Sequence, residues 1–82
     1  MNTIVIIFNN NSNNTSTDLE VPLDISANDL VIALNKAYDL GIDITNQKYC
    51  FLKAENPLVL LRGSKKLSDY GLHDGSIINF TK

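Results

Sequence analysis

Few side chains in this 82-residue chain could perform covalent chemistry. A catalytic thiol needs a base beside it, and the single cysteine and single histidine, Cys50 and His73, are the only such pair. Nothing in their spacing brings them together. One cysteine cannot form an internal disulfide, and with one histidine it cannot build a structural zinc site. The sequence therefore predicts no catalytic cysteine, no disulfide and no metal site.

The other chemically capable residues are equally sparse. Aspartate and glutamate are scattered singly along the chain, without a pattern that would raise the pKa of one carboxyl group beside another. The segment Gly63-Ser64-Lys65 lacks the upstream glycine and the spacing of a phosphate-binding loop. We therefore expect a protein that is not an enzyme and that uses no cofactor.

Length and composition indicate one small globular domain over residues 1–82. Hydrophobic residues make up 44% of the chain and charged residues 20%, as in ordinary globular proteins. The net charge of −2 and the lack of a dense basic patch argue against nucleic acid as a partner. No apolar run approaches the roughly 18 residues of a membrane helix, and Met1-Asn2-Thr3 lacks the basic start of a signal peptide. We expect a cytoplasmic protein without direct membrane insertion.

The N-terminal part predicts two strands joined by a long loop. Residues 4–8 are β-branched or aromatic throughout, which indicates a central strand with both faces at least partly covered. Leu19-Glu20-Val21 alternates as a second strand, and Pro22 marks its end because it lacks a ladder donor. Residues 9–17 are polar with no apolar anchor, so we expect a long, mobile hairpin loop there.

One helix is predicted over residues 27–40. Ser26 followed by Asp29 resembles a capping box, and Gly41 is the expected left-handed cap. Ile32 points away from the apolar face and is interpreted as a single surface residue. The residues of the apolar face are Ala27, Leu30, Leu34, Ala37 and Tyr38, with Val31 on its border.

The remaining chain predicts three more strands, over residues 49–52, 58–61 and 76–80. Pro57 suggests that the second of these lies at a sheet edge. Residues 67–72 are too few for a regular helix and could form one tight helical turn closed by Gly71, and Asp74-Gly75 forms a turn. The order ββαβββ predicts an α+β fold in which one helix covers one face of a mixed sheet.

Several of these segments resemble ubiquitin. They are Leu19-Glu20-Val21, the capped helix, and the sequence Leu-Ser-Asp-Tyr-Gly-Leu at residues 67–72 before a final strand. The resemblance covers nearly the whole chain and implies the ubiquitin-like β-grasp fold. It also implies a structural role for Tyr70, since the matching tyrosine of ubiquitin holds a loop by a hydrogen bond to backbone.

Among ubiquitin-like proteins, the chain is most similar to the bacterial YukD/EsaB family associated with type VII secretion. The shared features are the size, the polar segment after the first strand, Asp18-Leu19 opening the second strand, and the pattern of residues 66–76 before the last strand. The resemblance implies a cytoplasmic accessory or regulatory factor that acts by protein contact. The alternatives are a ubiquitin-like binding module of another complex, which includes a module cut from a longer chain, and a carrier or modifier that has lost its tail. Because Asn79-Phe80-Thr81-Lys82 contains no Gly-Gly pair, we expect no conjugation.

Strand alternation divides the apolar residues between the two sheet faces. For the first strand we place Ile4, Ile6 and Phe8 against the helix, although comparison with the family favours the other phase. Facing the helix we also expect Leu19, Val21, Tyr49, Phe51, Ile78 and Phe80. The helix-free face then receives Val5, Ile7, Cys50, Leu52 and Ile77. Such an apolar patch marks an interface, so we expect either a homodimer or a secretion-system membrane component on this face.

Overall fold

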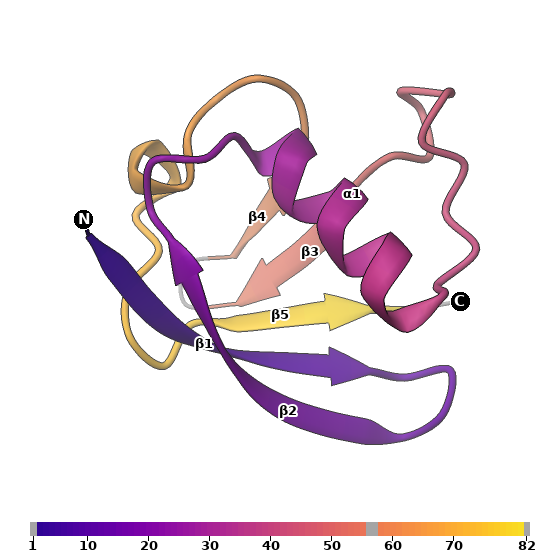
Figure 1. Ribbon diagram of the computed structural model, residues 1–82, viewed down its shortest axis with the longest axis horizontal. Coiled ribbons are helices and arrows are strands. Elements are labelled where there is room, and N and C mark those ends of the chain that lie inside the picture. Colours follow the sequence, from indigo (N-terminus) through magenta and orange to yellow (C-terminus); the bar gives the residue numbers. More distant parts are fainter. Residues whose placement is uncertain (1, 56–57, 82) are drawn as a thin grey trace.

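The computed structural model describes residues 2–55 and 58–81, which form one mixed sheet and one α-helix (Figure 1). The order ββαβββ is confirmed, with a short 3₁₀ helix between the last two strands. The elements are β1 (Thr3–Asn10), β2 (Thr15–Pro22), α1 (Ala27–Tyr38), β3 (Leu52–Glu55), β4 (Val59–Leu61), η1 (Leu67–Tyr70) and β5 (Ile77–Phe80).

The five strands lie in the order β2-β1-β5-β3-β4. The neighbouring strands β1 and β5 pair in parallel, whereas the other neighbours pair antiparallel. Helix α1 crosses one face of this sheet, and in the described part of the chain no α-helix covers the other face (Figure 1). This arrangement is the predicted α+β fold, and β4 lies at an edge as expected. Pro57, on which the edge prediction rested, lies outside the described residues.

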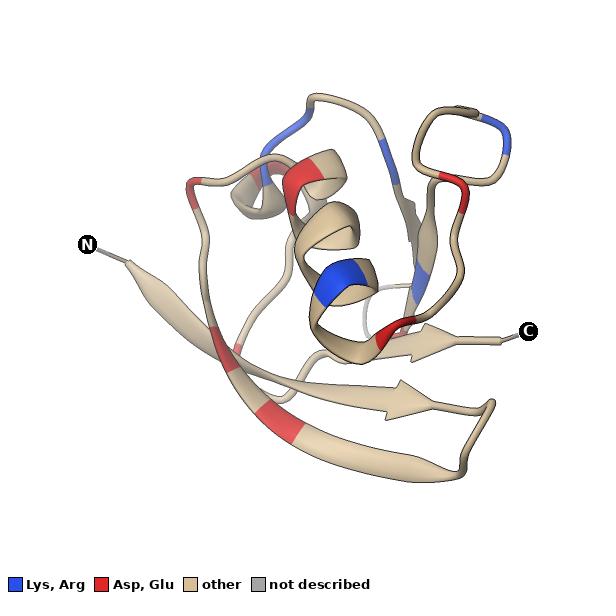
Figure 2. Cartoon of the chain, turned by 45° about the vertical axis from the view of Figure 1, so that its right-hand side comes forward, with Lys and Arg blue, Asp and Glu red and all other residues tan. Residues whose placement is uncertain are grey.

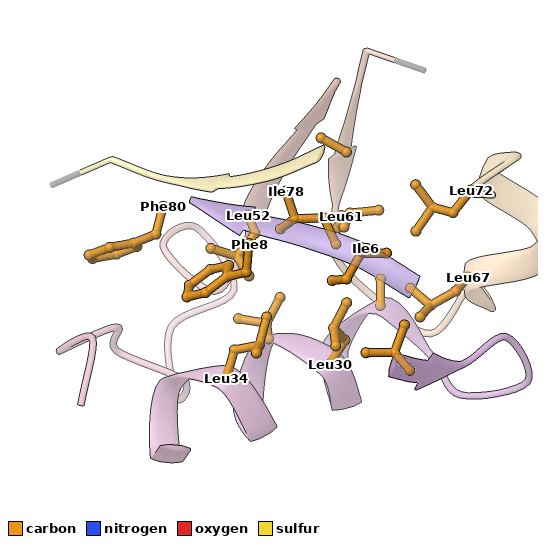
Figure 3. Close-up of a cluster of buried hydrophobic side chains, with 14 of the residues drawn as sticks. Ile6, Phe8, Leu30, Leu34, Leu52, Leu61, Leu67, Leu72, Ile78 and Phe80 are labelled. Carbon is orange, nitrogen blue, oxygen red and sulfur yellow. The ribbon is translucent and has the colours of Figure 1, made fainter. Parts of the chain in front are cut away.

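The core fills the space between the sheet and the helix. Ile6 and Phe8 of β1 point toward Leu30 and Leu34 of α1 (Figure 3). Ile4, in the same phase, is also buried. The predicted phase of the first strand is therefore confirmed. Its physical basis is that the opposite phase would have turned Thr3 and Asn9 inward in place of Ile4 and Phe8.

The hairpin between β1 and β2 is shorter and more ordered than the sequence predicts. The strands stay paired as far as Asn10 and Thr15, so the predicted loop over residues 9–17 is wrong. The Oδ1 atom of buried Asn10 accepts hydrogen bonds from the backbone N–H and the hydroxyl of Ser12, at 3.1 and 2.6 Å. Asn14 takes a left-handed conformation with φ of 58°. These asparagines shape a tight turn, which allows polar residues to continue the strand pairing beyond the apolar segment.

The start of the helix is as predicted, and its end is not. The Ser26 hydroxyl oxygen accepts a hydrogen bond from the Asp29 backbone N–H at 3.0 Å, which satisfies one free donor of the first turn. The helix ends at Tyr38 and is capped by Asp39, which has a left-handed φ of 53°, rather than by Gly41. The earlier end carries Leu40 back into the core.

Two assignments on the helix surface also change. Ala37 is exposed, whereas Val31, placed on the border of the apolar face, is fully buried. Ile32 is partly covered. The face that contacts the sheet is therefore turned toward Val31 relative to the predicted one.

The third strand lies later in the chain than predicted. Residues 49–51 precede it, and Tyr49 is 54% exposed while Phe51 is half-buried. Strand β3 begins at Leu52, where the sequence Leu-Lys-Ala-Glu alternates buried and exposed residues. Placing Tyr49 and Phe51 in the core was therefore wrong.

The segment between β4 and β5 is confirmed in detail. The single turn η1 ends at Gly71, whose left-handed φ of 75° suits a residue without a side chain. The Tyr70 hydroxyl donates a hydrogen bond to the Arg62 backbone carbonyl at 2.6 Å, as the resemblance to ubiquitin implied. This bond ties η1 to the end of β4.

Candidate partner-binding surface

The helix-free face of the sheet gathers three of the five predicted surface residues. Val5 is 42% exposed, and Ile7 and Ile77 are half-buried. Ile7 lies beside Ile77 in the parallel pairing of β1 and β5. Val5 lies two residues before Ile7 on the same strand and therefore on the same face. We call Val5, Ile7 and Ile77 the sheet-face strip.

The other two predicted surface residues belong to the core. Cys50 is 3% exposed and Leu52 is 2% exposed, and both contribute to the cluster between the sheet and α1. The prediction was wrong because it began the third strand at residue 49, which inverted the alternation. The regular alternation of Leu52-Lys53-Ala54-Glu55 was the sequence signal for the correct phase.

Acidic side chains flank the sheet-face strip on both sides. In the β1–β2 register, Glu20 lies opposite Val5 and Asp18 lies opposite Ile7. Glu55 of β3 lies opposite Ile77. Paired residues of neighbouring strands share a face, so these three exposed carboxylates border the strip. Figure 2 shows the two acidic positions of β2 close together on the outer strand of the hairpin. Sequence reasoning placed Glu20 outward but did not recognise the acidic border.

A hydrogen-bonded chain of polar side chains closes one end of the strip. The Asn9 amide donates to the Asn79 side-chain oxygen at 3.0 Å, and the Asn79 amide donates to a Glu55 carboxylate oxygen at 3.1 Å. These bonds cross from β1 through β5 to β3. They hold the Glu55 carboxylate beside the strip, so the apolar surface has a defined polar limit.

The opposite end of the strip is fixed by the turn before β5. The Val5 backbone N–H donates to Asp74 Oδ1, and the Val5 carbonyl accepts from the Gly75 N–H, each at 2.8 Å. The Asp74 carboxylate thus adds a fourth acidic group near the strip. The arrangement is suited to contact an apolar partner surface with basic groups around it, because opposite charges at the rim favour association.

The residues that could perform covalent chemistry have separate partners. The Cys50 thiol donates to the Asn28 side-chain oxygen at 3.2 Å, and burial, with a smaller effect of Asp43, raises the pKa of this thiol above its ordinary value of 9.0. Less of the reactive thiolate is therefore present at neutral pH. The exposed His73 ring lies next to the Asp74 carbonyl oxygen, at 2.9 Å. Within residues 2–55 and 58–81, no group of three or more His, Cys, Asp or Glu side chains could hold a metal ion.

A second exposed region lies on the loop between α1 and β3. Ile44 and Tyr49 are exposed there, and an apolar hollow lined by Tyr49 and Phe51 runs beside the end of β5. In this loop the Asp43 carboxylate accepts hydrogen bonds from the Thr45 hydroxyl and N–H, which lower the pKa of its carboxyl group. The charged residues that line the hollow are Asp43 and Lys53, so it lacks the acidic border of the sheet-face strip. It provides a matched control region for the sheet-face strip.

No helix in the described part of the chain is long and apolar enough to cross a bilayer.

Comparison with known proteins identifies one family. The model of the YukD protein of the WXG100 protein secretion system matches residues 4–79. No curated protein matches the chain.

Solved structures share the fold at low sequence identity. The ubiquitin-like domain of the Mycobacterium tuberculosis type VII secretion system protein ECCD1 is similar with a TM-score of 0.55 and 22% identity, over 100% of both chains. The ubiquitin-like domain of Plasmodium falciparum Dsk2 gives 0.63 and 17%, over 98% of this chain and 100% of that one. The C-terminal ubiquitin-like domain of mouse tubulin-specific chaperone e gives 0.71 and 10%, over 98% and 88%. These similarities show a ubiquitin-like β-grasp fold.

Proposed function

Because the chain belongs to the YukD family of the WXG100 protein secretion system, we propose that it is a cytoplasmic interaction module of a type VII secretion apparatus. It acts by non-covalent contact with another protein of that apparatus and performs no catalysis. The ECCD1 domain, itself a ubiquitin-like domain of a type VII secretion protein, supports the use of this fold in such an assembly.

The observation that carries the proposal is the exposed sheet-face strip with its acidic border. Val5, Ile7 and Ile77 remain at least partly exposed although the core is already filled from the other face. Burial of apolar surface in a partner contributes about 25 cal/mol per Å² removed from water. The carboxylates around the strip favour a partner whose contact surface is apolar at its centre and basic at its rim.

A binding experiment can test this surface with two matched variants. The strip variant carries Val5→Thr, Ile7→Thr and Ile77→Thr, which keep β-branched side chains in the strands and remove apolar surface. The control variant carries Ile44→Thr and Tyr49→Thr, which remove exposed apolar surface from the loop between α1 and β3. Each tagged protein is co-expressed with the membrane proteins of the same secretion system and purified after cross-linking.

We expect the wild-type chain and the control variant to retain a secretion-system protein and the strip variant to lose it. Circular dichroism and thermal melting first establish that both variants are folded. Equal retention by the strip variant would place the contact elsewhere. Sedimentation analysis tests the other occupant, because a wild-type dimer that the strip variant cannot form would indicate a second copy on this face.

A further inference from the structure

The outer edge of β2 presents a row of backbone groups that face away from the sheet. The Val5 N–H and C=O bond to the turn before β5, and the Ile7 N–H bonds to the Ser76 carbonyl at 2.9 Å. These residues of β1 therefore direct their backbone groups away from β2. In an antiparallel ladder, residues opposite such positions direct their own groups outward. Their β2 partners are Asp18 and Glu20, and Ser16 follows in the same alternation.

The row is long enough for another strand and has a defined end. Strand β2 spans eight residues paired with β1 without an interruption of register, and within residues 2–55 and 58–81 no other strand lies beyond it in the sheet (Figure 1). Pro22 occupies the next outward position and has no N–H to donate, so it closes the row. The opposite sheet edge, β4, spans only three residues. Strand addition is therefore favoured at β2.

The side chains of β2 determine which residue types an added strand would need. Asp18 and Glu20 are exposed and project from alternate positions onto the helix-free face. Between them, Leu19 projects to the other face and is partly buried against the core. An extended segment lying beside β2 would place every second side chain next to the carboxylates and the side chain between them next to Leu19.

We propose that the open edge of β2 binds an extended segment of a partner protein in which basic and apolar residues alternate. The segment adds antiparallel to β2, so that two of its basic side chains face Asp18 and Glu20 and the apolar side chain between these two covers Leu19. This inference rests on the proposed function only in taking the segment to belong to a secretion-system partner. The edge adjoins the sheet-face strip, because Glu20 and Asp18 lie opposite Val5 and Ile7.

A second copy of the chain is a poorer occupant of this edge. If two β2 strands paired antiparallel so that each used its whole outward row, Asp18 of one copy would lie opposite Asp18 of the other. Like charges directly opposite across a strand pair are destabilising. The same carboxylates that favour a basic segment therefore disfavour pairing of β2 with itself.

Amide hydrogen exchange of the purified chain tests the open row first. The backbone amides of Ser16, Asp18 and Glu20 should exchange faster than those of Thr17 and Leu19, whose partners in β1 direct their groups toward β2. Equal protection at all five amides would mean that the row is not open, and the proposal would fail.

Binding is then tested with the acetylated and amidated peptide Thr-Lys-Val-Arg-Val-Lys-Thr, followed by amide shifts and exchange. The peptide should slow exchange at Ser16, Asp18 and Glu20. Methylation of the three basic residues' backbone nitrogens, which face β2, should weaken binding on the order of tenfold or more, about 1.4 kcal/mol. Methylation of the two valine nitrogens, which face away, is the matched control. The proposal would be overturned if the peptide did not bind, or if the two methylated peptides bound with the same affinity.

A separate pair of variants tests whether the carboxylates of Asp18 and Glu20 attract the basic peptide. Asp18→Asn with Glu20→Gln should weaken peptide binding and reduce its dependence on salt, because exposed charge pairs are screened. Asp24→Asn with Asp69→Asn removes the same amount of charge from exposed positions elsewhere and should leave binding unchanged. Equal weakening by both pairs would show attraction to net charge alone and contradict the proposed site. Because these assays use only the purified chain and a peptide, their failure leaves the test of the sheet-face strip unaffected.

Discussion

Replacing Leu52 by alanine tests the corrected phase of β3. Leu52 is 2% exposed, lies opposite Leu61 of β4 and belongs to the core cluster. The substitution removes three carbon atoms, and at about 0.8 kcal/mol for each buried methylene the transfer term is about 2.4 kcal/mol. The cavity left behind adds to this, so we expect a total loss in the range of about 2–5 kcal/mol. For a domain of this size, each kcal/mol lowers the melting temperature by roughly 4–8 °C.

The matched control is the same substitution at Leu60. This residue lies in the neighbouring strand β4, opposite Lys53, and is 45% exposed. Its truncation should cost about 1 kcal/mol or less, because half of the side chain is already in water and no closed cavity forms. Urea denaturation followed by circular dichroism gives both free energies of unfolding. A cost below about 1 kcal/mol for Leu52→Ala, or a larger cost at Leu60, would refute the phase described here.

Three further changes test single contacts. Tyr70→Phe removes the hydrogen bond to the Arg62 carbonyl and should lower the free energy of unfolding by about 0.5–1.5 kcal/mol in urea titrations. Ser26→Ala removes the acceptor for the Asp29 N–H and should cost about 0.5–2 kcal/mol, measured in the same way; no change would mean that the cap is dispensable. Burial in the folded state raises the pKa of the Cys50 thiol above 9.0, so the protonated thiol contributes to stability below about pH 9. This contribution is lost as the pH rises through the pKa of the folded state. Wild-type stability should therefore fall more between pH 8 and pH 10 than that of Cys50→Ala, and an equal fall would contradict this linkage.

The parts of the fold predicted correctly have strong local signals. Ser26 and Asp29 mark the start of the helix, and Gly71 closes η1 in the left-handed conformation that glycine tolerates. The phase of β1 follows from its flanking polar residues, because Ile4 and Phe8 fit the core better than Thr3 and Asn9. In these segments the local and the tertiary preferences agree.

The errors occur where tertiary contacts override local composition. Tyr49 and Phe51 favour a strand by residue type, yet the chain turns before it enters the sheet, and the weaker alternation beginning at Leu52 forms β3. This error moved Cys50 and Leu52 onto the candidate surface. The polar hairpin was misjudged for a related reason, since the side-chain hydrogen bonds of Asn10 that shape the turn become visible only in three dimensions.

The apolar residues of the candidate surface could be predicted from the sequence, but the acidic residues around them could not. Val5, Ile7 and Ile77 follow from alternation along β1 and β5. The acidic border depends on register between strands that are distant in sequence, because Glu55 lies beside Ile77 only through the β3–β5 pairing. Strand register of this kind is set by the whole sheet.

The central claim is tested most directly by measuring export of WXG100 proteins from the organism that encodes this chain. The gene is deleted and replaced by the wild-type chain, the strip variant or the control variant, with equal intracellular levels established by immunoblotting. Our account predicts that deletion impairs export and that the wild-type chain and the control variant restore it. The variant with threonine at Val5, Ile7 and Ile77 should not restore export. Full export in the deletion strain, or full restoration by the folded strip variant, would contradict the account.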